Sequence, residues 1–292
     1  MDIWLQQLLI GLSVGTIYAL IALGYTMVYG IIKLINFAHG EVFMIGAFTG
    51  YYALTAWGLG FIPALLLAMG VSALLGVTIE RVAYRRLRNF PRLAALTTAI
   101  GVSLFIQYTT IYLRGAQSEA YPSLFPNRRL EILGAGINLD ALVILAVSVA
   151  LMAILQFIVQ KTRTGKAMRA VSFDLEAARL MGIPVNRTIS ITFAIGSALG
   201  GAAGVVYGLY YTRIDPLMGV LPGLKAFVAA VVGGIGSIPG AMVGGLVIGM
   251  VETLVSAAGL SLFRDAAAFL ILILILLFRP EGLFGRHTTE KV

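Results

Sequence analysis

Long, nearly uncharged runs of apolar residues recur along almost the whole chain, so its fold has to be compatible with lipid. An α-helix needs about 20 residues to cross a bilayer, and only helices and closed barrels satisfy their backbone hydrogen bonds there. We therefore predict an all-α polytopic membrane protein of about eight transmembrane helices, forming one transmembrane domain over residues 1–292. The predicted spans are residues 6–30, 36–57, 61–79, 94–113, 139–159, 188–212, 224–258 and 264–278.

The seventh run, residues 224–258, is interrupted near its middle. Gly233, Gly234, Gly236, Pro239 and Gly240 follow one another closely. Because proline and glycine weaken or end a helix, we predict two tilted or half-length segments joined by a break and buried against their neighbours. The run then either returns to the side on which it starts or crosses the membrane twice.

The distribution of charge predicts the orientation of the chain. The stretches "ERVAYRRLRNFPR" and "QKTRTGKAMRAVSFDLEAARLMGIPVNR", the tail after Phe278 and Lys33 together hold 15 of the 21 Lys and Arg residues. The opposite side keeps six basic residues, balanced by six acidic ones. Since cytoplasmic loops are enriched in Lys and Arg, we expect the loop at about 160–187 and the C-terminus to be cytoplasmic. The N-terminus and a loop at about 114–138 are then external.

Glycines recur every fourth residue at Gly196, Gly200, Gly204 and Gly208. On a helix this spacing forms a bare stripe that lets a neighbouring backbone approach closely. A similar ridge follows the break in the seventh run. We interpret both as helix-packing surfaces rather than ligand contacts.

Two distant segments resemble each other. "TMVYGIIKLINFAHGEVFMIGAFTG" and "GVVYGLYYTRIDPLMGVLPGLKAFVAAVVGG" each place Tyr-Gly before a polar bend and a glycine-punctuated apolar run. The predicted topology gives the spans that lead into them opposite directions, as in inverted repeats of transporters. Chance similarity between apolar segments is the alternative.

Few ionisable residues fall inside the predicted spans. Asn36, His39 and Glu41 are candidate pathway or gating residues, because buried polar groups in a membrane default to functional hypotheses. The alternative is a local role, with Asn36 and His39 capping a helix and Glu41 pairing with Lys33. Glu252 is expected to pair within the bundle. So few acids provide little material for ion coupling, which suggests that energy for transport comes from outside the chain.

The sequence contains none of the motifs expected of an enzyme in this setting. It has no cysteine, no phosphate-binding loop of the Walker type, no "HExxH" helix and no His/Cys metal cluster. We expect a transport subunit rather than an enzyme, with no bound cofactor and no metal site, and no contact with nucleic acid.

Residues Ser172–Pro184, "SFDLEAARLMGIP", form a short polar helix in one of the basic loops. Ser172 or Asp174 can cap its start, acidic residues lie in its first turn, and Gly182 and Pro184 end it. A rigid helix of about nine residues, tied to two spans, can transmit movement from a soluble partner into the bundle. The alternative is a solvated loop helix without such a role.

The motif "EAARLMG", Glu176–Gly182, matches the start of the EAA loop that permeases of ABC importers present to their ATPases, although the Leu-Pro end of that motif is missing. Together with "NFAHGEVFMIGAF", "VVGGIGSIPGAMVGGLVIGMVE" and "FRPEGLFG", it makes nearly the whole chain resemble the LivH-type permeases of branched-chain amino acid ABC importers. The permeases of urea and short-amide importers are similar.

The resemblance implies an importer of leucine, isoleucine and valine in a bacterial inner membrane. Its partners would be a second, LivM-like permease, two cytoplasmic ATPase subunits that use the ATP, and a periplasmic amino-acid-binding protein. Glu176, Ala177, Ala178 and Gly182 would couple the permease to the ATPases, and transport would proceed by alternating access. The alternatives are a urea or amide importer, a stand-alone secondary carrier with Glu41 as its coupling group, and a membrane scaffold without transport activity.

Overall fold

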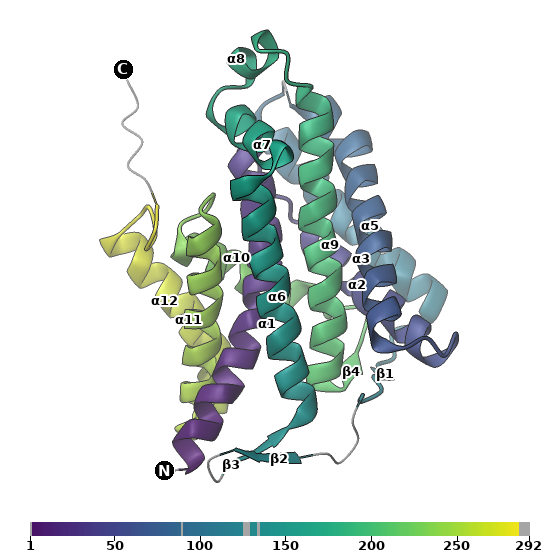
Figure 1. Cartoon of the computed structure of the whole chain (residues 1–292), viewed down its shortest axis with the longest axis vertical. Helices are drawn as coiled ribbons and strands as arrows, with labels where there is room; N and C mark the ends of the chain where they lie inside the picture. The colour runs from purple at the N-terminus through teal and green to yellow at the C-terminus, as the bar shows by residue number, and fades with distance from the viewer. Residues whose placement is uncertain (1, 89, 125–128, 133–134, 286–292) are drawn as a thin grey trace.

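The computed structural model describes residues 2–88, 90–124, 129–132 and 135–285. Parts of the predicted external loop at 114–138 and the end of the basic C-terminal tail therefore lie outside the described residues. Helices that run roughly along the long axis make up the bundle (Figure 1). The α-helices are α1 (Asp2–Ile32), α2 (His39–Thr55), α3 (Phe61–Ile79), α4 (Arg85–Leu87), α5 (Arg92–Arg114), α6 (Leu139–Lys161), α7 (Arg163–Phe173), α8 (Leu175–Leu180), α9 (Val185–Tyr211), α10 (Val220–Gly233), α11 (Ile238–Ala257) and α12 (Arg264–Phe278).

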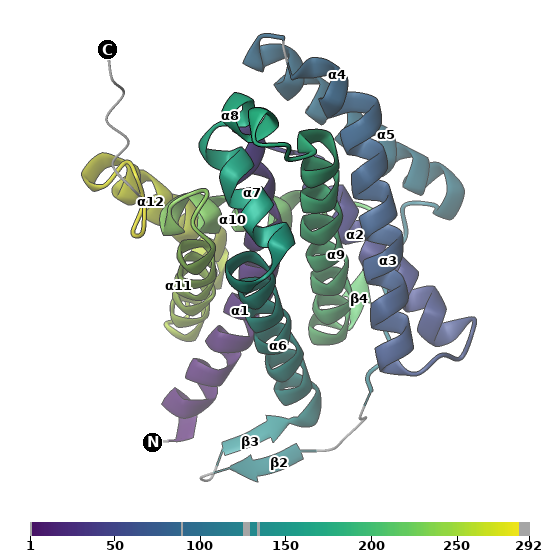
Figure 2. The same cartoon turned by 45° about the horizontal axis from the view of Figure 1, so that its top comes forward.

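Short elements connect these helices. A π-helix, η1 (Glu80–Tyr84), joins α3 to α4, and a 3-10 turn, η2 (Ser261–Phe263), precedes α12. Strand β1 (Glu119–Ala120) pairs with β4 (Arg213–Ile214), and β2 (Arg129–Ile132) pairs with β3 (Ala135–Asn138), both antiparallel. We call the end that carries α4, α7 and α8 the loop end and the end that carries β2 and β3 the hairpin end (Figures 1 and 2).

Seven helical segments in the described part of the chain are long and apolar enough to cross a membrane. They confirm the prediction of an all-α polytopic membrane protein. Helices α1 and α9 lie at the centre, with 78% of their apolar windows buried, whereas only 6% of the α12 window is buried. The outer faces of α12 and α5 therefore need lipid or another subunit to cover them.

Two short helices begin inside the bundle rather than at one of its ends. Helix α2 has 17 residues and α10 has 14. Helix α2 begins beside Gly24 of α1 and Gly200 of α9, both inside their helices, and ends near Tyr121 at the hairpin end. Residues 33–38 thus re-enter the bundle from the loop end, and α2 completes the passage from about half depth. Helix α2 thus covers residues 39–55 of the span expected at 36–57.

Helix α10 has the same arrangement in the opposite direction. Its start contacts Gly40 in the first turn of α2, and its end lies at the loop end, where Gly236 approaches Gly30. Helices α1 and α9 run in opposite directions, and so do the half-length helices α2 and α10 that follow them (Figure 1). The inverted relation that the sequence indicated is therefore present in the fold.

The break in the seventh predicted run lies at residues 234–237. Gly234 has φ +102°, a left-handed conformation that favours glycine, and the Ser237 hydroxyl accepts a bond from the Gly240 amide at 3.2 Å. Helices α10 and α11 are consequently antiparallel neighbours: the short α10 runs from the interior to the loop end, and α11 is long enough to cross back. The segment "FRPEGLFG" folds back onto this region, where the amides of Leu283 and Phe284 donate to the Val232 and Gly233 carbonyls at 2.9 and 3.0 Å. It thus satisfies carbonyls left free at the end of α10.

The glycine stripes pack as predicted. Along α9, Gly196 faces Gly24, Gly204 faces the Phe43 carbonyl, and Gly208 faces the ring of Tyr121. The ridge on α11 places its glycines against α10 and α1 in the same way. Close helix approach, rather than ligand contact, accounts for both stripes.

Candidate functional site

The start of α2 and the start of α10 meet inside the bundle. A β-carbon on Gly219 would lie 2.6 Å from the Gly40 carbonyl oxygen, and one on Gly223 would lie 3.1 Å from the Gly40 Cα. Only glycines allow backbones to approach this closely. We call this contact between Gly40, Gly219 and Gly223 the half-helix junction. Each helix directs the positive end of its dipole toward the junction.

His39 and Asn36 lie beside the junction and are both 1% exposed. The His39 ring fills the space over Gly24 and Gly200 and packs edge-on against Tyr25 at 4.9 Å. Asn36 Oδ1 accepts a hydrogen bond from the Tyr84 hydroxyl at 3.2 Å. Both side chains hold the re-entrant segment in place. Neither of them caps α2, because its N-cap residue is Ala38 and no side chain bonds to the first amides.

Glu41 is 2% exposed and lies in the first turn of α2. Its Oε1 accepts a hydrogen bond from the Ser103 hydroxyl of α5 at 3.2 Å, while the buried Oε2 has no hydrogen-bond donor and faces Gly219. The expected pairing with Lys33 is wrong: Lys33 is exposed, and its Nζ lies 5.8 Å from the centre of the Tyr29 ring. Lys33 ends α1 with φ +54°, outside the junction.

A second buried network joins α10 to α11, α12 and α1. Lys225 Nζ lies 2.7 Å from Glu252 Oε1 and 2.6 Å from Asp265 Oδ1, and the Tyr18 hydroxyl donates to Glu252 Oε2 at 3.0 Å. The expectation that Glu252 pairs within the bundle is confirmed. Lys225, counted as an external basic residue from the sequence, is instead 4% exposed. Its charge is neutralised inside the protein.

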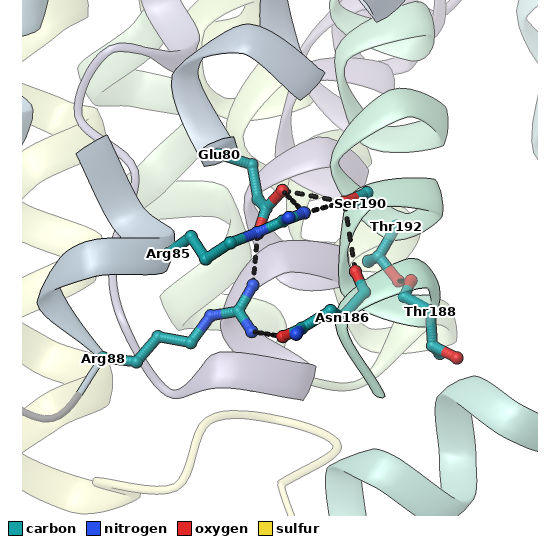
Figure 3. Close-up of polar contacts among 7 residues, drawn as sticks. All are labelled: Glu80, Arg85, Arg88, Asn186, Thr188, Ser190 and Thr192. Atoms are coloured by element: carbon teal, nitrogen blue, oxygen red, sulfur yellow. Dashed lines mark hydrogen bonds and ion pairs between the residues drawn. The ribbon is translucent and has the colours of Figure 1, made fainter. Parts of the chain in front are cut away.

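At the loop end, Glu80 joins η1 and α4 to α9 (Figure 3). Its fully buried carboxylate accepts from Arg85 at 2.9 and 3.2 Å, from the Ser190 hydroxyl at 2.8 Å, and from Arg88. Arg88 also donates to Asn186 Oδ1 at 2.8 Å. We call these five residues the Glu80 cluster. It fixes the end of the α3 span against the start of α9, next to the loop that carries α7 and α8.

The short polar helix in the loop is confirmed, in a shorter form than expected. Helix α8 spans six residues, because Asp174 rather than Ser172 caps it: Asp174 Oδ1 accepts from the amides of Glu176 and Ala177, both at 2.9 Å. Residues before Asp174 belong to a separate helix, α7, which the sequence analysis did not predict. Gly182 ends the motif with φ +78° and open space around its Cα.

The four candidate coupling residues do not share one surface. Glu176, Ala177 and Gly182 are exposed, whereas Ala178 is 4% exposed and faces the bundle. Ala178 can secure α8 but cannot contact a partner. Three large apolar side chains are exposed beside them instead, and we call them the apolar loop patch: Phe173 (95% exposed), Leu180 (88%) and Met181 (81%).

In the described part of the chain, no group of three or more His, Asp or Glu side chains is arranged to hold a metal ion. The polar groups of the junction and of the Glu80 cluster are arranged to pack helices and to compensate charge. This arrangement can position helices and hold them together.

An interrupted bundle with two short helices that run in opposite directions is typical of membrane transporters, and comparison with known proteins agrees. The family model described as "Branched-chain amino acid transport system / permease component" matches residues 7–278. The chain belongs to this family, whose members are one component of a transport system. It is a multi-pass membrane protein and a transport subunit, not an enzyme.

Its relatives align over almost their whole length. The high-affinity branched-chain amino acid transport system permease protein BraD of Pseudomonas aeruginosa is 44% identical, with 99% of this chain and 98% of BraD covered. The proteins named LivH of Salmonella typhimurium and Escherichia coli K12 are 45% identical with the same coverage. A chain of the solved structure "PsaBC from Streptococcus pneumoniae in complex with Fab" covers 97% of this chain, with a TM-score of 0.49 and 13% identity.

Sequence reasoning missed Glu80 and Lys225. Glu80 begins a strongly basic stretch, which directed attention to topology rather than to the acid. A signal was present: Glu80 precedes Arg85 and Arg88 by five and eight residues, so one carboxylate can meet both guanidinium groups. Lys225 lies five residues after the start of α10, inside an apolar run, and a basic residue there indicates a buried partner.

Proposed function

We propose that this chain is the transmembrane permease subunit of an ATP-driven importer of leucine, isoleucine and valine. It forms the translocation pathway together with a second, LivM-like permease and works by alternating access. The single observation that carries this proposal is the full-length match to the permease family, at 44–45% identity to relatives that are named for branched-chain amino acid transport.

The proposed orientation in the bacterial inner membrane follows from charge. The loop-end stretches 80–92 and 160–187 hold eleven Lys and Arg residues, which supports a cytoplasmic loop end. The N-terminus and the loop at about 114–138 are then periplasmic, and the C-terminus is cytoplasmic. The chain forms one permease domain, with the coupling loop at about 160–187.

The loop end is proposed to receive two cytoplasmic ATPase subunits. Large apolar side chains outside a membrane span call for a partner, and the apolar loop patch lies next to the exposed Glu176 and Ala177. Pressure on α7 and α8 passes to α9, which packs against both helices, and through the Glu80 cluster to α3. The ATP is bound by those partner subunits, and this chain itself binds no cofactor. A periplasmic binding protein supplies the amino acid at the hairpin end.

The test is uptake by proteoliposomes that contain the purified assembly, the binding protein and internal ATP. Radiolabelled leucine is expected to accumulate, unlabelled isoleucine and valine are expected to compete, and omission of this chain is expected to abolish uptake. Accumulation of urea or a short amide, with no accumulation of leucine, would assign the chain to a related importer instead.

A further inference from the structure

Glu41 is the one acidic residue of the half-helix junction, and its bonding is incomplete. Of its two carboxylate oxygens, Oε1 accepts one bond from Ser103 at 3.2 Å. Oε2 is buried, has no hydrogen-bond donor, and lies beside Gly219, the residue that precedes α10. A buried polar atom without a hydrogen-bond partner calls for an explanation, and a role in binding is one.

The charged groups around the junction do not neutralise Glu41. No ion pair among the described residues includes it. Lys33 is exposed, Lys225 pairs with Glu252 and Asp265, and the His39 ring faces Gly24 and Gly200. A carboxylate inside a membrane protein is costly without a counter-charge, which makes a passing cation the group most strongly favoured at this position.

Helices α2 and α10 lower the energetic cost of a carboxylate at this depth. Glu41 occupies the first turn of α2 and faces the N-terminal end of α10, so the positive ends of two helix dipoles act on it. They lower the cost of the charge without filling the hydrogen-bonding capacity of Oε2. The site is therefore electrostatically prepared for a donor that the resting chain does not supply.

We propose that Glu41 binds the α-ammonium group of the amino-acid substrate as it passes the half-helix junction. This inference rests on the proposed function and names the group that recognises the substrate. Broken helices that meet near half depth are where transporters with inverted repeats place their substrates. Discontinuous backbone also lets α2 and α10 move as separate bodies.

The surroundings of the junction suit the rest of such a substrate. The rings of Tyr25, Phe37 and Phe227 pack together beside it, with centroids 5.9 to 6.0 Å apart along the series. They offer apolar surface to an aliphatic side chain. In the present conformation Gly40 and Gly219 are in backbone contact, so the site opens only when α2 and α10 separate. A closed junction between transport events prevents leakage.

The first experiment replaces the charge and keeps the shape of the side chain. Glu41→Gln retains an acceptor for Ser103, and Glu41→Asp retains the charge. In the complete assembly, Glu41→Gln is expected to lower ATP-driven leucine uptake about tenfold or more, because a charge-assisted hydrogen bond is lost. The loaded binding protein should still stimulate ATP hydrolysis. Glu41→Asp should retain more uptake than Glu41→Gln. The comparison variant, Ser103→Ala, removes the hydrogen bond to Oε1 but keeps the charge, so it should lower uptake far less than Glu41→Gln, by about threefold at most.

The second experiment tests the site directly and decides the matter if Glu41→Gln fails to assemble. The chain contains no cysteine, so Ser103→Cys introduces its only thiol beside Glu41. During turnover, a thiosulfonate reagent that carries an ammonium group should label this thiol about tenfold faster than a neutral reagent of similar size, because the carboxylate concentrates cations. Leucine supplied by the binding protein should slow the labelling.

Two results would overturn the inference. One is leucine uptake by Glu41→Gln equal to that of the wild type. The other is labelling of Ser103→Cys that depends neither on the charge of the reagent nor on leucine. Failure of the proposed function is distinguishable from both, since the wild-type assembly itself would then not accumulate leucine.

Discussion

Individual residues of this protein hold the bundle together through buried charges rather than through apolar contacts alone. Glu80 is fully buried and contacts two guanidinium groups and a hydroxyl at the loop end. Breaking a buried ion pair leaves an uncompensated charge, whereas an exposed pair contributes little. The chain contains pairs of both kinds.

The first prediction compares the two kinds of pair. Glu80→Gln keeps the size of the side chain but leaves Arg88, 14% exposed, without its counter-charge, so the free energy of unfolding in detergent should fall by about 3 kcal/mol. The control is Glu119→Gln, which removes an exposed partner 3.6 Å from Arg114 and should cost less than about 1 kcal/mol. Equal losses, measured by denaturant titration, would contradict a special role for the Glu80 cluster.

The second prediction concerns Lys225. Lys225→Met leaves Glu252 buried without a cation and should lower the free energy of unfolding by about 3 kcal/mol or more. Adding Glu252→Gln removes the stranded charge and should recover part of that loss, giving a coupling energy of roughly 1–3 kcal/mol in a double-mutant cycle. Strictly additive losses would mean that the two residues do not act as a pair.

Residues such as these show where sequence reasoning stops. The sequence identified Asn36, His39 and Glu41 as polar residues at membrane depth, and all three are buried at the junction. It offered Lys33 as the ion-pair partner of Glu41 in one of the two alternatives, because nearness in sequence was the only available guide to partners. The actual donor, Ser103, is 62 residues away, a contact that only the packing of α2 against α5 creates.

At the scale of elements, glycines determine how closely the helices approach. A β-carbon on Gly204 would meet the Phe43 carbonyl and the Ala47 backbone of α2, which cannot move aside as a flexible side chain can. Gly101, in α5, has no atom within 4 Å of such a β-carbon. An alanine at Gly204 therefore tests the helix contact, whereas an alanine at Gly101 changes only the helix propensity.

The third prediction is that Gly204→Ala lowers the thermal stability of the purified protein, by about 1–3 kcal/mol, because α9 and α2 must move apart. Gly101→Ala should instead be neutral or stabilising by up to about 1 kcal/mol, since alanine is the better helix former. The measurement is the unfolding midpoint in a fixed detergent. Similar behaviour of the two variants would remove the packing role of the stripe.

Helix α8 and its end at Gly182 form the element proposed to couple this chain to the ATPases. Gly182 has φ +78° and Gly58, at the hairpin end, has φ +60°, and both lie in open space. A β-branched residue is strained at either position, so the two substitutions match in their local cost.

The fourth prediction is that Gly182→Val lowers ATP-driven leucine uptake on the order of tenfold, whereas Gly58→Val leaves it near the wild-type value. Glu176→Trp, a bulky change on the exposed face of α8, should act like Gly182→Val. Normal uptake by both loop variants, with normal association of the ATPases, would exclude the proposed role of α8.

The elements themselves were largely predictable. The apolar runs predicted the spans, the Gly-Pro cluster predicted the break between α10 and α11, and the cap chemistry of Asp174 predicted α8. The half-length form of α2 was not predictable, since its start is fixed by the fit of the His39 ring over Gly24 and Gly200. Helix α7 was missed because the loop was interpreted from its acidic residues alone.

For the whole molecule, the structure places α1 and α9 at the centre of the bundle, with the short helices α2 and α10 packed against them. Buried charges are compensated in the Glu80 cluster and in the Lys225 network, which leaves Glu41 as the carboxylate open to a passing group. Nothing in the sequence resembles an ATP-binding loop. The proposed mechanism therefore assigns the energy of transport to partner subunits that act on the loop end.

The decisive measurement is accumulation of radiolabelled leucine against its gradient in proteoliposomes, with the chain alone and with its companions. We expect no accumulation by the chain alone under a proton, sodium or no gradient, and accumulation that requires ATP hydrolysis once the second permease, the ATPases and the binding protein are present. Uphill uptake by the isolated chain without ATP would contradict the account.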